Sequence, residues 1–420
     1  MQIERLELQN FKCFEKLEMD FGKITLLTGA NSSGKSSIIY ALLGMLQSEE
    51  FPFQYSPNGK FVNMGDYKEM VFQQDLKKDI HLNLRCEINN LKYNFKTIWE
   101  NEEIQLLPSV KKSEQSYDLT KLSLSKIDKE LYAFEVKNKQ NEFQEEVKIK
   151  DFISEYFYFA YDASLEKWPD MTQALAKGKW PDMTQALLGA PNFNNANRLF
   201  NFINPSQIPK RTSYEITQGN LKVGIHGEGF ADQIIQWQTR SDPKLKELIG
   251  IMKDLKLFHI IKSVRLGGGR YELRVEVHKN GLDAALNDVG FGTSQFLPIV
   301  VADLQLPNDS TLMVAQPEVH LHPSVQAEFG SYLVKQALEK NKRYIIETHS
   351  EYLFNRIRLH IVQGDIKPED VKMYYLQNDG QGTKCHLLEF TKDGQIKNAP
   401  KDFFDTYLMD TMDIALNAIK

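Results

Sequence analysis

The sequence predicts an α/β fold with a mixed sheet and an antiparallel β subdomain, and three patterns carry that prediction. Apolar and polar residues alternate over residues 16–21, the period of a strand with one buried face. Residues 80–100 alternate again, which predicts an antiparallel hairpin or meander. From about residue 242, helical and strand patterns succeed one another, and this order is typical of layers around a partly parallel sheet.

The N-terminal segment predicts a strand, a glycine-bearing loop and a helix in succession. Residues 24–27 form a compact apolar run, as in a buried strand. After residue 36, apolar residues recur at helical spacing. These residues are Ile38, Ile39, Leu42, Leu43 and Leu46. The order strand, loop, helix is the one that a nucleotide-binding fold requires.

The loop at residues 29–36 reads GANSSGKS and satisfies the phosphate-loop pattern GxxxxGK[ST]. Its backbone N–H groups should face phosphate oxygens at the positive end of the following helix. Lys35 should reach the β- and γ-phosphates, and the Ser36 hydroxyl should hold Mg²⁺. We expect ATP, because no NKxD element for guanine occurs. The predicted cofactor-binding residues here are Gly29, Ala30, Asn31, Ser32, Ser33, Gly34, Lys35, Ser36 and Ser37.

The C-terminal half predicts further strands and helices. Helical spacing covers residues 243–258 and 324–339. Strand patterns cover residues 271–277, 311–314 and 344–346. Strands that alternate with helices in this way favour the sheet and layers stated above.

Composition limits the class of protein. The chain has 420 residues, enough for two or three domains, and its net charge of −5 gives no general attraction to nucleic acid or anionic membranes. No stretch approaches the roughly 18 apolar residues of a membrane span. The three cysteines are far apart and form no CxxC pair, so we expect a cytoplasmic protein without disulfides or zinc.

We divide the sequence into four regions. Residues 1–100 form an N-terminal ATPase lobe, 101–241 an insertion or arm, 242–390 a C-terminal ATPase lobe, and 391–420 a tail. Within the insertion, the nonapeptide KWPDMTQAL occurs twice between residues 167 and 187. A recent duplication or an artefact explains two identical copies better than an old repeat does, although a surface docking loop is the alternative.

Three segments of the second half carry a family resemblance. They read DVGFGTSQ from residue 288, TLMVAQPEVHLHP from residue 311 and YIIETHS from residue 344. The first predicts a glycine-serine turn over residues 288–295 that leads into an apolar helix, and each of the other two predicts a buried strand that runs into a polar loop. They resemble the signature, Walker B and switch-histidine elements of ABC-type ATPases in the RecF/SMC/OLD group. Within that group they are similar to a bacterial ATPase family often found in anti-phage defence loci. Matching motifs run from residue 3 to residue 405, with residues 100–200 the least recognisable.

The resemblance implies a two-lobed head with a helical insertion and a head-to-tail homodimer that encloses two ATP molecules. Gly292 and Ser294 would then serve the partner's γ-phosphate, and His349 would contact the γ-phosphate of its own subunit. His320 and His322 would belong to a dimer contact rather than to a metal site. A separate effector, such as a nuclease or toxin, would be controlled by dimerisation. Two alternatives remain: a DNA-binding repair or chromosome-maintenance module like RecF or SMC heads, and a non-hydrolysing scaffold.

The sequence departs from this pattern at the end of the Walker B strand. Ala315 occupies the position where relatives carry an acid that positions Mg²⁺ and its waters. Gln316 can still orient water, and Glu318 and Glu347 are nearby carboxylates. The alanine is either an engineered block of hydrolysis, which we favour, or the mark of a natural slow switch. We expect ATP binding with poor turnover, because losing one transition-state group commonly costs about 10²–10³-fold.

Overall fold

The computed structural model describes residues 1–48, 51–52, 55–88, 91–102, 107–117, 120–127, 131–137, 142–148, 198–208, 211–215, 222–400 and 403. The duplicated KWPDMTQAL segment lies outside these described residues.

The chain forms two compact units that interleave in sequence. The first comprises residues 1–21, 36–202 and 306–311. The second comprises residues 22–35, 203–305 and 312–420. The phosphate loop therefore belongs almost entirely to the second unit, and the division of the sequence into four regions stays a prediction.

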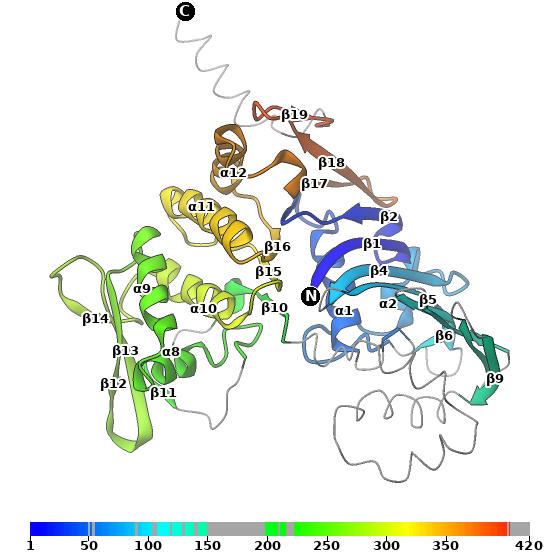
Figure 1. Ribbon diagram of the computed structural model, residues 1–420, viewed down its shortest axis with the longest axis horizontal. Coiled ribbons are helices and arrows are strands. Elements are labelled where there is room, and N and C mark those ends of the chain that lie inside the picture. Colours follow the sequence, from blue (N-terminus) through cyan, green and yellow to red (C-terminus); the bar gives the residue numbers. More distant parts are fainter. Residues whose placement is uncertain are drawn as a thin grey trace, which may run out of the picture. The chain divides into compact units, whose positions relative to one another are not determined.

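The first unit is built on an eight-stranded antiparallel sheet in the order β2-β1-β4-β5-β6-β7-β8-β9. Its N-terminal strands run beside one another in Figure 1. The meander predicted at residues 80–100 is confirmed, and the sheet continues beyond it. The strands are β1 (Gln2–Phe11), β2 (Phe14–Asp20), β4 (Ile80–Ile88), β5 (Leu91–Glu102), β6 (Leu107–Tyr117), β7 (Thr120–Lys126), β8 (Leu131–Lys137) and β9 (Glu142–Lys148). The unit also contains α2 (Tyr67–Met70) and the 3₁₀ turn η1 (Phe72–Gln74).

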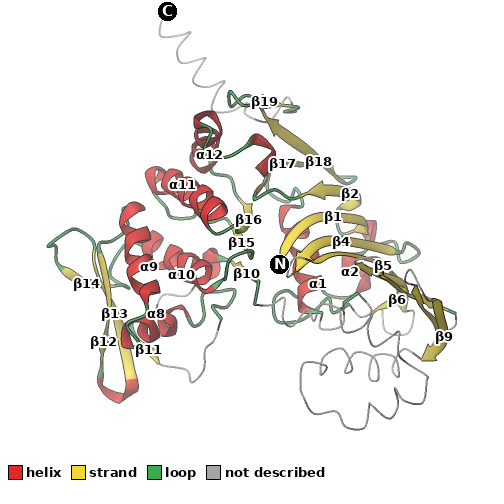
Figure 2. Cartoon of the chain, in the orientation of Figure 1, coloured by secondary structure: helices red, strands yellow, loops and turns green. Residues whose placement is uncertain are grey.

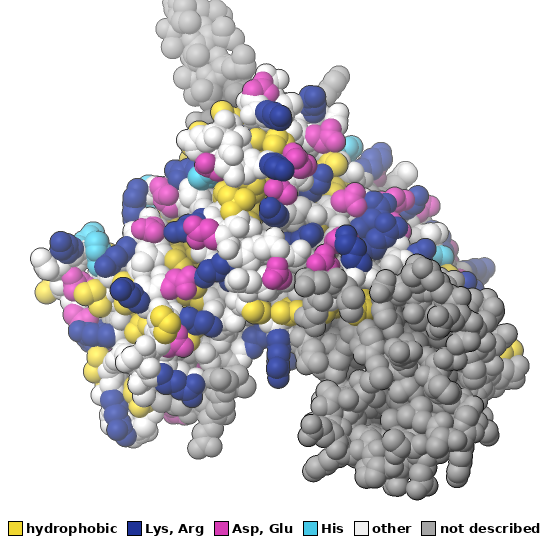
Figure 3. All heavy atoms as spheres, viewed as in Figure 1, with side chains coloured by type: hydrophobic (Ala, Val, Ile, Leu, Met, Phe, Trp, Pro, Cys, Tyr) yellow, Lys and Arg dark blue, Asp and Glu magenta, His cyan; other side chains and the backbone are white. Residues whose placement is uncertain are grey.

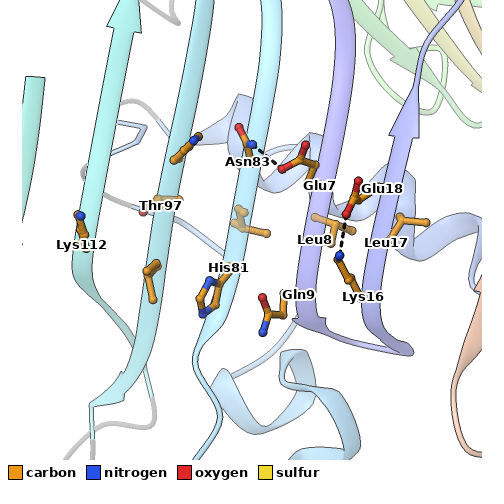
Figure 4. A pocket seen from close by; sticks show the side chains of 13 residues that line it. Glu7, Leu8, Gln9, Lys16, Leu17, Glu18, His81, Asn83, Thr97 and Lys112 are labelled. Carbon is orange, nitrogen blue, oxygen red and sulfur yellow. Dashed lines mark hydrogen bonds and ion pairs between the residues drawn. The ribbon is translucent and has the colours of Figure 1, made fainter. Parts of the chain in front are cut away.

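The two faces of this sheet differ, as period-2 patterning requires. One face is apolar: Leu6, Leu82 and Phe95 are almost fully buried. The other face is polar and carries a shallow hollow, where Asn83 donates a hydrogen bond to Glu7 and Lys16 pairs with Glu18 (Figure 4). Lys and Arg side chains are interspersed with Asp and Glu over the described surface in view (Figure 3).

The second unit contains most of a seven-stranded mixed sheet in the order β10-β15-β16-β3-β17-β18-β19. β3 is parallel to both of its neighbours, β16 and β17, while β18 returns antiparallel. The strands predicted at residues 24–27, 311–314 and 344–346 are confirmed. The strands are β3 (Ile24–Gly29), β10 (Phe200–Ile203), β15 (Thr311–Ala315), β16 (Arg343–Glu347), β17 (Val371–Asn378), β18 (Thr383–Phe390) and β19 (Ile396–Lys397).

Helices accompany this sheet, and Figure 2 shows them in two groups. One group is α11 (Pro323–Glu339) beside α12 (Glu351–Gln363). The other is α8 (Phe230–Thr239), α9 (Pro243–Asp254) and α10 (Phe291–Gln305), beside strands β11 (Tyr214–Glu215), β12 (Ile260–Arg265), β13 (Arg270–Glu276) and β14 (Asp283–Ala285). Short 3₁₀ turns are η3 (Pro205–Gln207), η4 (Gly267–Gly269) and η5 (Pro368–Asp370). Within the described residues, no helix combines the length and apolar character needed to cross a membrane.

One local expectation needs correction. The sequence predicts a glycine-serine turn over residues 288–295, but α10 already begins at Phe291. Gly292 and Ser294 therefore lie in the first helical turn, and the Ser294 hydroxyl donates a hydrogen bond to the Phe291 carbonyl at 3.0 Å. A serine can satisfy its hydroxyl within a helix by this backward bond, so the serine-rich signature does not prevent helix formation.

Candidate functional site

The phosphate loop connects β3 to α1 (Lys35–Gln47), and its backbone is shaped for close approach. Gly29, Ser32 and Gly34 have positive φ angles of 140°, 60° and 100°. A Cβ atom at Gly29 would lie 2.2 Å from the Leu376 carbonyl oxygen, so only glycine fits there. The loop conformation is thus dictated by its glycines and by the neighbouring strand β17.

Polar groups inside the loop fit a phosphate anion. The Ser33 side chain is 1% exposed, and its Oγ has no hydrogen-bond partner among the described residues. The Ser33 carbonyl accepts a hydrogen bond from the Thr383 hydroxyl at 3.0 Å, which anchors the loop. Residues 30–32 are exposed, and α1 begins at Lys35 with the positive end of its dipole at the loop. A buried hydroxyl without a partner beside a helix N-terminus suits an oxyanion.

Lys35 is held inside the loop by backbone carbonyls. Its side chain is buried, and Nζ donates to the carbonyl oxygens of Gly29 at 3.0 Å and Ala30 at 2.8 Å. Burial lowers the pKa of Lys35, while the negative charges of Glu347 and Glu318 oppose that shift. Among the described residues, neutral carbonyls are the hydrogen-bond partners of Lys35 Nζ, and a desolvated ammonium in this position gains from an anionic partner, which phosphate oxygens can provide.

The strands β15 and β16 end side by side, and the residues after them are bonded together. Gln316 adopts a positive φ of 48°, and its N–H donates to the Glu347 carbonyl at 2.7 Å. The Glu318 carboxylate accepts from the Thr348 hydroxyl at 2.8 Å and from the His349 N–H at 2.6 Å. Burial raises the pKa of Glu318, although these two bonds act against the shift. Glu318 therefore fixes the loop that carries His349.

Lys35 lies close enough to Glu318, Glu347 and His349 to interact electrostatically with each of them. Both carboxylates act on Lys35, and Lys35 acts on Glu318 and His349. Partial burial of the imidazole, with a smaller effect from Lys35, lowers the pKa of His349. The structure thus brings together three residues predicted for the site and adds Glu347, which is 4% exposed.

The other predicted site residues occupy two further places. Ala315 ends β15 and presents only a methyl group there. Gly292 packs against the loop that follows, where an added Cβ would lie 2.6 Å from the His320 carbonyl oxygen. Among the described residues, no hydrogen bond or ion pair joins Gly292 or Ser294 to residues 29–36. Contact of Gly292 and Ser294 with the γ-phosphate of a nucleotide in a second subunit stays a prediction.

Sequence reasoning missed two polar residues near the site. Gln326 and Ser350 are joined by a hydrogen bond at 2.5 Å, and Ser350 also caps α12 through the Leu353 N–H at 3.1 Å. The cap itself has a sequence signal, because a serine directly before a helical pattern is typical of an N-cap. The pairing with Gln326 has no such signal, since it depends on how α11 and α12 meet.

A buried strand, a glycine-shaped loop with an enclosed lysine and a following helix define a phosphate-loop nucleotide-binding protein. The sequence matches the AAA ATPase domain family over residues 1–354, and the chain belongs to this family. A second match covers residues 366–414, to a family described as a protein of unknown function (DUF3696). No curated protein matches the sequence.

Solved structures offer two distant likenesses. The SMC head domain from Thermotoga maritima has 12% sequence identity and a TM-score of 0.39, covering 92% of this chain and 98% of that one. A structure of the SmcHead bound to the C-winged helix domain of ScpA has 12% identity and a TM-score of 0.44, covering 93% and 99%. Both TM-scores are low, so the family assignment rests on the sequence match over residues 1–354.

Proposed function

We propose that this ATPase-family chain binds ATP with Mg²⁺, and that two copies then associate head to tail to control a separate effector. The observation that carries the proposal is the buried Lys35, which donates to two backbone carbonyls. Near it lies the loop at residues 347–350, called the histidine loop below, which Glu318 holds in place. The effector, a nuclease or toxin in anti-phage defence, is supported by the motif resemblance alone. Cytoplasmic action is part of the same proposal.

Each residue has a role that follows from its chemistry. Lys35 exchanges its two carbonyl contacts for phosphate oxygens. The Ser33 hydroxyl, which has no hydrogen-bond partner among the described residues, donates to the same anion. Ser36 is the residue that would hold Mg²⁺, which when bound neutralises charge on the phosphates. The lowered pKa makes His349 neutral near pH 7 before ATP binds, and its ring N–H can donate to the γ-phosphate. Gly292 and Ser294 act on the nucleotide of the second copy.

Turnover is weak in this proposal because no carboxylate stands at residue 315. The alanine methyl group cannot accept hydrogen bonds from waters around a metal ion. Glu318 is a poor substitute, since both of its oxygens already accept bonds from the histidine loop. Gln316 remains as the residue that can orient water. We therefore expect hydrolysis about 10²–10³-fold slower than with an acid at this position.

The test compares this chain with Ala315→Glu and Ala315→Gln, measuring ATP hydrolysis and ATP-dependent dimerisation by light scattering in the presence of Mg²⁺. Glutamine matches glutamate in size without its charge. We expect all three proteins to dimerise with ATP and only the glutamate variant to hydrolyse it briskly. Dimerisation without hydrolysis in every variant would reduce ATP to a switching ligand. Absence of ATP-dependent dimerisation in every variant would contradict the head-to-tail proposal.

The effector is tested separately. The protein encoded next to this gene is co-expressed with the chain, and its nuclease or toxic activity is measured with and without ATP. We expect activity that depends on ATP and on Lys35. A neighbour whose activity ignores both, combined with ATP-dependent DNA binding by the chain itself, would favour the repair or chromosome-maintenance alternative.

A further inference from the structure

Gln326 bridges two loops of the second unit. It lies in the first turn of α11, where its Nε2 donates to the Leu321 carbonyl at 2.8 Å and its Oε1 accepts from the Ser350 hydroxyl at 2.5 Å. A carbonyl oxygen can only accept, so the orientation of the amide is fixed by its partners. One side chain thereby ties the end of the loop after β15 to the loop after β16.

The near ends of the same two loops are already joined. The bonds are those from the Gln316 N–H to the Glu347 carbonyl and from Thr348 and His349 to Glu318. They fix residues 316–318 against residues 347–349. The bridge at Gln326 extends this attachment to Leu321, so that residues 316–322 and 347–350 form one bonded assembly.

The far end of this assembly touches the predicted signature. Next to Leu321, the His320 carbonyl faces the backbone of Gly292 so closely that no side chain fits between them. The rings of Phe291 and His320 also lie 5.6 Å apart, centre to centre. Residues 320–321 and the first turn of α10 are thus in direct contact, which gives a displacement of one a physical route to the other.

We propose that Gln326 is a positioning residue that couples the histidine loop, which senses nucleotide in the same subunit, to the Gly292–Ser294 surface offered to the second copy. This inference rests on the proposed function, because it assigns a task to the same site. When the loop at residues 347–350 is fixed by ATP, the bridge fixes residues 319–322 with it. Without the bridge, residues 319–322 keep their mobility although ATP is bound.

The test is amide hydrogen exchange of residues 319–322 and 348–350, with and without ATP and Mg²⁺, at a protein concentration where light scattering shows monomers. The variant is Gln326→Glu, which retains an acceptor for Ser350 but places a carboxylate oxygen against the Leu321 carbonyl. In the unmodified chain we expect ATP to slow exchange in both segments. In the variant we expect residues 348–350 to be slowed as before, and the slowing at residues 319–322 to fall about tenfold, the equivalent of one lost hydrogen bond.

A matched control separates coupling from general loosening. Arg356 also joins α12 to α11, donating to Glu328 at 3.0 Å and to the Ser331 hydroxyl at 2.9 Å. Within the described part of the chain, no hydrogen bond or ion pair joins its side chain to either loop. Arg356→Gln should leave the response at residues 319–322 within about twofold of the unmodified chain, since sites without shared partners act nearly independently. Ser350→Thr keeps the hydroxyl and should behave like the unmodified chain. An equal loss in Arg356→Gln would overturn the proposal.

The outcomes distinguish this proposal from the function on which it rests. Slowing at residues 348–350 without slowing at residues 319–322 in the unmodified chain overturns the coupling but leaves ATP binding intact. Coupled slowing in a chain that never dimerises refutes the head-to-tail assembly and leaves the coupling. If ATP does not bind at all, the ATP-free proteins decide: Gln326→Glu must speed exchange at residues 319–322 relative to Arg356→Gln, because it loses the bond to the Leu321 carbonyl. Equal exchange at residues 319–322 in the two variants rejects the bridge.

Discussion

The adjacent strands β15 and β16 end in opposite ways. β16 runs into Glu347, Thr348 and Ser350, which are each buried, and the backbone or side chains there bond to the neighbouring loop. β15 ends in Ala315, whose side chain has no polar atom. Yet the residue after it, Gln316, is held by the Glu347 carbonyl in a left-handed conformation.

The difference shows that β16 and α11 supply the bonds that position the loop after β15, whereas the end of β15 itself supplies no polar side chain. The loop after β15 is positioned by bonds from β16 and α11, so the alanine does not remove a group that holds the loop. In the proposed function, the alanine lacks the carboxylate that the reaction would use. We therefore expect the change at Ala315 to affect hydrolysis while leaving ATP binding and local structure in place.

Lys35→Met should have the largest effect, because it removes the cation that interacts with Glu318 after β15 and with Glu347 at the end of β16. Charge-assisted hydrogen bonds contribute about 1.5–3 kcal/mol each, so the loss of the contacts to phosphate should weaken ATP binding at least about 100-fold. Calorimetric titration with ATP and Mg²⁺ measures the effect. Ala315→Gln is the control and should bind ATP like the unmodified chain. A loss smaller than about tenfold would mean that the loop at residues 29–36 does not hold the phosphates.

The sequence alone was sufficient to predict the phosphate loop and the strands that carry the site residues. The GxxxxGK[ST] pattern located the loop that the glycines shape, and continuous apolar runs located β3, β15 and β16. Buried parallel strands and amphipathic helices leave strong patterns, because burial on both faces or on one stripe restricts residue type. The position of Ala315 at the end of β15 could be read for the same reason.

Contacts between segments that are distant in the chain could not be predicted from the sequence. The hydrogen bond between Gln326 and Ser350 depends on the packing of α11 on α12. The sequence around neither residue contains a pattern that indicates the other as its partner. Strands β6 to β9 are rich in charged and polar residues, which weakens the apolar alternation by which a strand is recognised in a sequence. The start of α10 at Phe291 was also hidden, since glycine and serine favour turns as well as first helical turns.

Gly292→Ala tests the loop after β15, because the added methyl group presses on a loop that bonds from β16 hold in place. The added Cβ would meet the His320 carbonyl at 2.6 Å, and overpacking of this kind costs about 1–3 kcal/mol. We expect a matching loss in the unfolding free energy of the second unit, measured with denaturant. Gly290→Ala is the matched control, because nothing lies within 4 Å of its added Cβ. Equal stability of the two variants would show that residues 316–322 move away from the added methyl group at little cost, and that β16 does not fix them.

His349 tests the β16 side with the smallest expected effect. Its pKa lies below the ordinary value of 6.5, so the free site is neutral at pH 7, whereas a nearby γ-phosphate favours the charged imidazole and raises that pKa. Binding therefore takes up a proton, and ATP affinity should strengthen as the pH falls from about 8 to about 6. The gain should stay below about tenfold, the equivalent of one pKa unit. His349→Gln cannot take up this proton, so the ratio of its dissociation constant to that of the unmodified chain should grow as the pH falls, and subtracting the two profiles removes the titration of ATP itself. Parallel profiles would place His349 away from the γ-phosphate and leave its loop with a structural role alone.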